Sequence, residues 1–190
     1  MSFAERRRFL WLCLLGSLIL LAITAAAFAN GTTLARLRFE DLAQQSTSVA
    51  RLRCLGSGFL WYRGELWTET RFEVVERNKG LLPGIVTVRT IGGISGHLHS
   101  HVDGVPVFRS GEEVYLFLWQ RPGEPYRVLG WAQGTFRIAR AESGNETVTQ
   151  DSAMAPIFDP RTRTFRHGGI RNLSVGMFQL KLRRALEEKN

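Results

Sequence analysis

Three histidines alternate with other residues near the middle of the chain. They are His97, His99 and His101, and Asp103 follows them. On a β-strand, residues two apart point to the same side, so the three imidazoles would share one face. Imidazole nitrogens bind Zn²⁺, Ni²⁺ and Cu²⁺ at about 2 Å. The pattern is therefore a candidate site for a divalent transition metal, which Asp103 or His167 would complete.

The same stretch also fits an exposed loop that binds nothing. Gly92, Gly93, Gly96 and Gly104 surround the histidines, and glycines favour turns and loops. Three consecutive same-face residues also span about 13 Å of strand, so at most two of the histidines share an ion unless the strand bends. Apart from such a metal, the sequence indicates no cofactor.

Aromatic residues gather around a predicted hairpin connection at 61–65. Trp61, Tyr62 and Trp67 flank it. Aromatic rings are over-represented at protein interfaces, so these three are candidate partner-binding residues. The alternative is that the rings pack in the core.

The residues that would indicate an enzyme are missing from the sequence. There is no Gly-x-Ser-x-Gly elbow and no glycine-rich phosphate loop. Glu69 and Glu73 share a strand face with Arg71 between them, which is typical of a solvated ladder rather than of acid–base catalysis. A metal-assisted hydrolase would need an ordered carboxylate and an open coordination position beside the histidines. We therefore expect a chain that is not an enzyme.

Strands dominate the elements that would position these residues. Apolar and polar residues alternate from Ser48 onward, which predicts β structure. The predicted strands cover residues 48–59, 66–75, 85–91, 113–119 and 126–139. Glycines predict a bulge at 56–58 and kinks at 130 and 134. The polar run 142–150 predicts a loop, and residues 157–165 predict a terminal hairpin.

Two helices are predicted at the ends of this β region. Phe39, Leu42 and Ala43 have helical spacing, and Val175, Phe178, Leu182 and Leu186 share one face of a helix at about 174–189. The whole pattern predicts a mainly β fold. Its expected form is a small OB-like barrel of five to six strands with a short N-terminal helix and a C-terminal helix.

Residues 1–29 have the parts of a secretory signal. Three arginines at 6–8 precede an apolar core from Phe9 to about Ala22, and Ala27 and Ala29 fit a cleavage site after Ala29. The alternative is an uncleaved membrane anchor, because 9–29 is close to the roughly 20 residues that span a bilayer. Both interpretations place the domain of residues 30–190 outside the cytoplasm: periplasmic, secreted or anchored. The membrane would then be a partner only through an uncleaved leader.

Composition adds two constraints. The formal net charge is +8, and without residues 1–29, which hold three arginines and one glutamate, it is +6. The basic residues are scattered, so we expect no nucleic-acid partner. Cys54 is the one cysteine after the leader, which excludes an internal disulfide and predicts a buried, small hydrophobic residue.

The middle of the chain carries a series of turn and strand motifs. They are FEVVERNKG at 72–80, VTVRTIGG at 86–93, and YRVLGWAQG at 126–134. This series resembles a group of exported bacterial proteins of uncharacterised function. In layout it is more distantly similar to the OB-fold of netrin-like domains and tissue inhibitors of metalloproteinases. The resemblance implies a fold and no catalytic group. The N-terminal cysteine of those inhibitors has no counterpart, because cleavage would leave Asn30 first.

These observations lead to one expected function and two alternatives. The expectation is a non-enzymatic exported module that binds an envelope or extracellular protein at the cell envelope. The first alternative is a metal-binding protein that uses His97, His99 and His101. The second is a metal-assisted hydrolase built on the same histidines.

Overall fold

The computed structural model describes residues 34–188. The predicted signal or anchor segment, 1–29, lies outside these residues. In the described part of the chain, no helix combines the length and the apolar character needed to cross a membrane.

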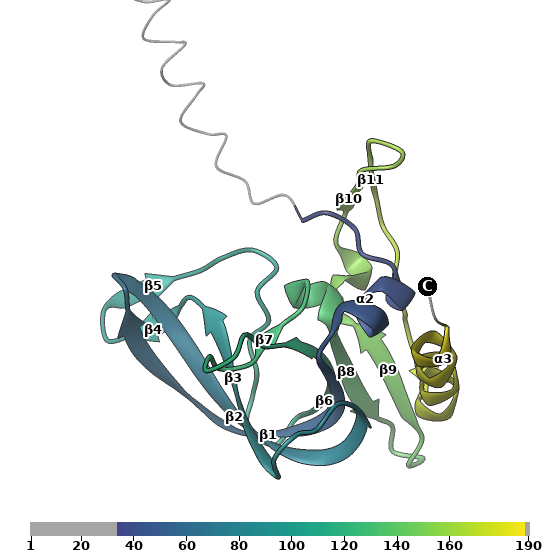
Figure 1. Cartoon of the computed structure of the whole chain (residues 1–190), viewed down its shortest axis with the longest axis horizontal. Coiled ribbons are helices and arrows are strands. Elements are labelled where there is room, and N and C mark those ends of the chain that lie inside the picture. Colours follow the sequence, from purple (N-terminus) through teal and green to yellow (C-terminus); the bar gives the residue numbers. More distant parts are fainter. Residues whose placement is uncertain (1–33, 189–190) are drawn as a thin grey trace, which may run out of the picture. The chain divides into compact units, whose positions relative to one another are not determined.

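A large antiparallel sheet forms the body of the domain (Figure 1). Its strands are β1 (Ser48–Tyr62), β2 (Glu65–Lys79), β3 (Ile85–Ile91), β6 (Glu113–Trp119), β7 (Arg127–Val128), β8 (Thr135–Arg140), β9 (Glu146–Gln150) and β12 (Leu173–Ser174). They are hydrogen-bonded in the order β12-β9-β8-β6-β1-β2-β3, and β7 pairs with β6. Two small hairpins stand apart from the sheet: β4 (Gly93–Ser95) with β5 (Leu98–Ser100), and β10 (Ile157–Asp159) with β11 (Thr164–Arg166).

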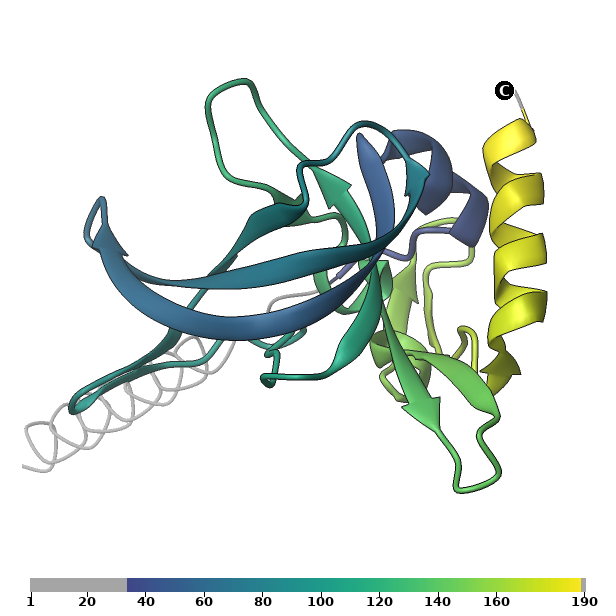
Figure 2. The same cartoon turned by 90° about the horizontal axis from the view of Figure 1, so that it is seen from below.

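The long β1–β2 hairpin is strongly curled (Figure 2). Its register shifts at three places, between Val49 and Ala50, between Arg51 and Leu52, and around Gly56. Each bulge adds local twist and bends the strand that carries it. The third shift falls at Gly56, whose φ is 151°, so the bulge predicted at the glycines of β1 is confirmed there by the strand register.

Strand β6 separates two hydrophobic clusters. Val114, Leu116 and Leu118 point into the first, which fills the curl of β1, β2 and β3. Tyr115 and Phe117 point into the second, between the sheet and the helices. All five are fully buried, as expected for a central strand with both faces covered.

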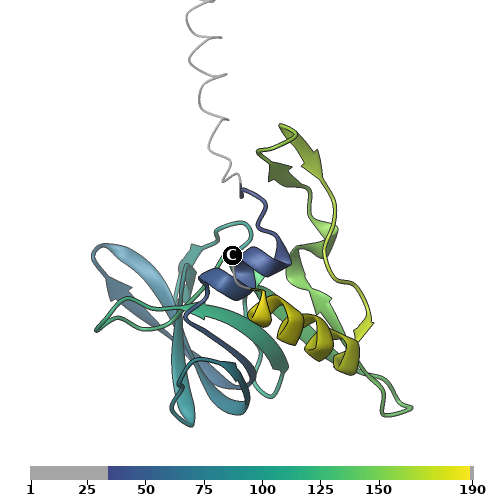
Figure 3. The same ribbon diagram turned by 45° about the vertical axis from the view of Figure 1, so that its right-hand side comes forward.

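Two helices contribute to the second cluster and lie over one face of the sheet (Figure 3). They are α2 (Phe39–Gln45) and α3 (Val175–Glu187), close to their predicted bounds. The ring of Phe39 meets Phe117, Phe136 and Phe178 edge-on at 5.5–5.7 Å between centroids. Ser174 caps α3 by accepting a hydrogen bond from the Met177 backbone N–H.

The strands of residues 34–188 form no continuous hydrogen-bonded ladder around a barrel. Strand β7 has two residues, because Gly130 turns left-handed at φ 64° and a 3₁₀ turn follows at Trp131–Gly134. The link from β3 to this segment is an isolated parallel bridge between Val88 and Tyr126. The mainly β fold with its two helices is therefore confirmed, whereas no closed ladder of strands is found within residues 34–188.

One predicted loop is a strand. The polar run 142–150 contains β9, which pairs with β8 and buries Val148. The alternation of Thr147, Val148 and Thr149 is compatible with a loop or a strand. The segment forms a strand because it pairs with the free edge of β8. The loop prediction is therefore wrong over 146–150, whereas the predicted hairpin at 157–165 is confirmed by β10 and β11.

Candidate binding site

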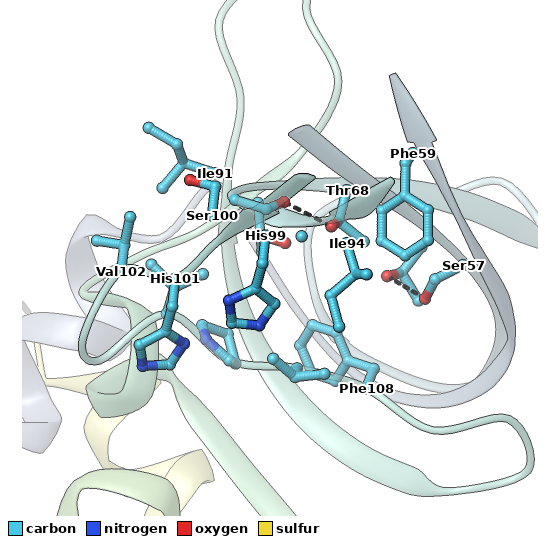
Figure 4. A pocket seen from close by; sticks show the side chains of 17 residues that line it. Ser57, Phe59, Thr68, Ile91, Ile94, His99, Ser100, His101, Val102 and Phe108 are labelled. Atoms are coloured by element: carbon cyan, nitrogen blue, oxygen red, sulfur yellow. Dashed lines mark hydrogen bonds between the residues drawn. The ribbon is translucent and has the colours of Figure 1, made fainter. Parts of the chain in front are cut away.

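A cavity of about 190 Å³ opens at the outer end of the curled hairpin (Figure 4). Its walls come from β1 and β2, from the end of β3, from the β4–β5 hairpin, and from the loop after β5. The lining residues are Ser57, Phe59, Thr68, Thr70, Thr90, Ile91, Gly92, Gly93, Ile94, His99, Ser100, His101, Val102, Val105, Pro106, Val107 and Phe108. We call this cavity the apolar pocket, because most of its walls are hydrocarbon.

Glycine lets β4 lie directly on the β1–β2 hairpin. Gly93 has φ 143°, and a Cβ there would lie 2.5 Å from Thr68 Oγ1 and 2.7 Å from Phe59 Cδ1. A larger residue would be strained at this φ and would push the Thr68 and Phe59 side chains out of place. The Gly92-Gly93 pair thus folds the chain over the hairpin and creates the roof of the apolar pocket.

Hydroxyl groups line the side of the pocket that faces the sheet. Ser57 Oγ and Thr70 Oγ1 are 2.8 Å apart and hydrogen-bonded, and Thr68 Oγ1 donates to the Gly92 carbonyl at 2.7 Å. Figure 4 shows both bonds. Since these hydroxyls already have partners, they impose little desolvation cost on an apolar ligand.

Exposed hydrophobic side chains surround the pocket. Phe59, Trp61, Ile94 and Leu98 are each about half exposed, at 49–56%, and Val107 is 73% exposed. A group of large apolar side chains around a cavity is unusual for a surface with no partner. We call these five residues the apolar rim.

The three predicted partner-binding aromatic residues differ in their exposure to solvent. Trp61 and Tyr62 lie exposed at the tip of β1, where the guanidinium groups of Arg63 and Arg89 lie 5.2 and 5.1 Å from the Tyr62 ring. Trp67 is only 9% exposed and presents little surface to a partner. The interface prediction therefore depends on Trp61 and Tyr62.

The three histidines are not equivalent. His99 lies in β5 and His101 follows it, and both line the apolar pocket, whereas His97 lies in the β4–β5 turn. The rings of His99 and His101 stack at 6.5 Å with planes 8° apart. Parallel planes do not direct two nitrogen lone pairs at one ion unless the rings turn.

The residues proposed to complete a metal site lie apart from each other. Asp103 Oδ1 is 3.2 Å from His101 Nε2, but His167 lies near the Met154 carbonyl. Within the described part of the chain, no group of three or more His, Cys, Asp or Glu residues is arranged to hold a metal ion. Metal binding therefore stays a prediction, limited to the His99–His101 pair and Asp103.

A network of ion pairs, which the sequence analysis did not predict, lies on the face of the sheet opposite the apolar pocket. Arg51 binds Glu113 and Glu146, and Arg140 also binds Glu146. Hydrogen bonds from Arg51 and Arg140 lower the pKa of Glu146 to about 2. For Glu113 burial opposes the shift, yet hydrogen bonds from Arg53 and Arg51 lower its pKa. Carboxylates kept ionised in this way are poorly suited to act as general acids, because a general acid must carry a proton to donate.

One weak feature of the sequence could have indicated the apolar pocket. Ile94 and the Val105-Pro106-Val107 run are apolar residues in an otherwise glycine-rich, polar stretch. Apolar residues in a loop indicate either burial or an interface. Ser57 and Thr70 gave no signal, because their approach depends on the strand pairing of β1 with β2.

Comparisons of the chain with models of protein families, with curated proteins and with solved structures found no match.

Proposed function

We propose that this chain is a non-enzymatic, exported module that binds another protein at the cell envelope, through the apolar pocket and the apolar rim. The observation that carries the proposal is the concentration of exposed apolar side chains around one cavity. Removing such a surface from water on binding yields roughly 25 cal/mol per Å². The partner would insert a large apolar side chain into the pocket and lay its flanking residues on the rim.

The size and chemistry of the pocket suit this role. An apolar cavity of about 150 Å³ accommodates a benzene ring, so about 190 Å³ has room for one large side chain. Beside it, Trp61 supplies an amphipathic ring of the kind that is common at interface hot spots. Its position at a hairpin tip leaves it accessible to a flat or grooved partner.

The pocket lining favours binding over catalysis. Among the described residues that line it, His99 and His101 are the titratable ones, and the Asp103 carboxylate, 3.2 Å from His101 Nε2, lies outside the lining. A hydrolase would also need a group that stabilises a developing oxyanion, and none of the described lining residues is a lysine or an arginine. Binding requires none of these groups.

An OB-like barrel is part of the proposal. Strands β1, β2, β3, β7 and β6 follow one another around the first hydrophobic cluster, and β6 returns to β1. The parallel Val88–Tyr126 bridge, in which the Arg89 N–H donates to the Tyr126 carbonyl at 2.8 Å, supports closure between β3 and β7. OB folds bind ligands through one face and its loops, which supports a binding role by analogy alone.

Site-specific photocrosslinking tests this proposal. The full chain would carry a photoreactive phenylalanine at Trp61, Ile94 or Val107 and be irradiated in cells that export it. We expect each position to form the same covalent adduct with one envelope protein. Adding Phe59→Asp should abolish the adducts, because a carboxylate at the pocket would have to be buried on binding.

Leu81 provides the matched control. It is 96% exposed, more than any residue of the apolar rim, but lies in the loop after β2. A photoreactive residue there should form no such adduct. If Leu81 crosslinks as efficiently as Ile94, or if Phe59→Asp leaves the adducts unchanged, the apolar pocket is not the binding site.

A further inference from the structure

The β10–β11 hairpin carries three exposed arginines. Arg161 and Arg163 lie in its turn and Arg166 ends β11. Within residues 34–188, none of the three guanidinium groups is in an ion pair. Asp159, the one acidic residue between 155 and 170, accepts a hydrogen bond from the Arg161 backbone. The hairpin is therefore a cationic surface whose charge is not neutralised by its neighbours.

Apolar side chains accompany these arginines. Phe165 is 62% exposed and Met154, just before β10, is 70% exposed. The Phe165 ring meets Phe158 across the hairpin at 5.5 Å between centroids. Arginines interleaved with exposed aromatic rings are typical of segments at the membrane–water interface, where the ring lies at headgroup depth.

Backbone hydrogen bonds join this hairpin to the first described residues. The Arg36 N–H donates to the Phe158 carbonyl at 2.8 Å, and the Phe158 N–H donates to the Leu34 carbonyl at 3.3 Å. Figures 1 and 3 show the hairpin projecting from the domain beside this N-terminal segment. A Cβ on Gly168 would lie 3.1 Å from Arg36 Nη2, so the Arg36 guanidinium lies against the end of the hairpin.

With an uncleaved leader, the position of Leu34 in the chain brings this surface close to a membrane. Leu34 is five residues after Ala29, where the predicted leader ends, and five residues span at most about 18 Å. A leader that stays in the bilayer therefore keeps Leu34, and the hairpin bonded to it, within reach of the lipid headgroups.

We propose that the β10–β11 hairpin, with Arg36, docks on the anionic phospholipid headgroups of the bilayer. The arginines contact the phosphates while Phe165 and Met154 enter the interfacial layer. Each arginine strengthens attraction to an anionic surface about fivefold. The apolar pocket is lined by β1 to β5 and the loop after β5, so none of its lining residues belongs to the β10–β11 hairpin.

Hydrogen exchange of the full chain in lipid nanodiscs tests this docking. Nanodiscs of phosphatidylcholine alone would be compared with nanodiscs that also contain phosphatidylglycerol. We expect the amides of residues 157–166 to exchange several-fold more slowly with the anionic lipid. The protection should vanish near 1 M salt, where the Debye length is about 3 Å.

Two triple variants separate hairpin docking from a general effect of charge. Arg161→Gln, Arg163→Gln and Arg166→Gln together should remove the lipid-dependent protection. Arg71→Gln, Arg109→Gln and Arg183→Gln remove the same charge from exposed arginines elsewhere and should preserve it. Equal exchange of residues 157–166 in both lipids, or equal loss of protection in both triple variants, would overturn the proposal.

Discussion

Arg51 of β1 donates hydrogen bonds to Glu146 of β9 at 2.9 and 3.0 Å, although β6 and β8 lie between these strands in the sheet. Adjacent strands are about 4.8 Å apart, so three steps across a flat sheet would cover about 14 Å. The contact therefore depends on the curl of the sheet. The side chains of Arg51 and Glu146 are 13% and 19% exposed. The ion pair thus joins β1 to β9, three strands away in the sheet.

Replacing Glu146 should change how stability depends on pH. The folded pKa of Glu146 is lowered to about 2 from 4.5, so its stabilising effect is present above about pH 4.5 and is lost as pH falls toward 2. Glu146→Gln should lower the free energy of unfolding by about 1–3 kcal/mol at pH 7. The difference in the free energy of unfolding between this variant and the wild type should become smaller below pH 4.5. Urea denaturation at a series of pH values measures it.

Glu142→Gln is the control for this experiment. Glu142 lies in the β8–β9 turn, is exposed, and loses the same charge when replaced. It should change stability by less than about 0.5 kcal/mol. A gap for Glu146→Gln that is equally large at pH 2.5 and pH 7 would contradict the assignment of the pH dependence to Glu146.

Gln133 should hold the N-terminal segment on the domain. Its side chain is buried, accepts a hydrogen bond from the Leu37 N–H at 2.8 Å and donates to the Ala35 carbonyl at 2.8 Å. Gln133→Met keeps the side-chain volume but removes the hydrogen bonds to the Leu37 N–H and the Ala35 carbonyl. Each lost bond should lower the free energy of unfolding by about 1–3 kcal/mol. We expect faster hydrogen exchange at the Leu37 amide and a lower midpoint of thermal unfolding.

Gln120→Met provides the comparison, because the Gln120 amide makes one local hydrogen bond, to the Glu124 carbonyl. It should leave exchange at Leu37 unchanged. If Gln133→Met also left that amide protected, the N-terminal segment would be held by other contacts.

Cys54 should be unreactive in the folded protein. It is 1% exposed, and burial raises the pKa of its thiol, which leaves little of the reactive thiolate. In a full chain with Cys13→Ser, iodoacetamide should modify Cys54 no faster than the domain opens. Denaturant should restore the rate of a free thiol. Fast labelling of the native chain would show that β1 opens at Cys54.

Any zinc affinity of the histidine cluster should depend on two of its three members. His99→Ala or His101→Ala should weaken Zn²⁺ binding, measured by calorimetry on an untagged chain. His97→Ala should change it little, because His97 lies in the β4–β5 turn outside the pocket lining. Equal losses for all three variants would show that the turn rearranges to bring the rings together. If none of the three variants changed Zn²⁺ binding, the histidine cluster would not be a metal site.

Local patterns in the sequence determined much of the secondary structure. The bounds of β3 and β6 follow from short apolar, β-branched runs between turn residues, and α3 follows from apolar residues at helical spacing. The bulge at Gly56 was also predictable, because a glycine inside an alternating strand has few other uses. Each of these signals lies within a few residues of the structure that it predicts.

Tertiary structure decided the rest, because the deciding contacts join residues far apart in the chain. Trp61 and Trp67 look alike in sequence, yet one is 56% exposed and the other 9%, since Arg127 lies over the Trp67 ring at 5.2 Å. Residues 146–150 form strand β9 because they can pair with the free edge of β8. The apolar pocket exists because Gly93 lets β4 lie against β1 and β2. A curled sheet sets which residues meet, and that curl is a property of the whole sheet rather than of any one segment.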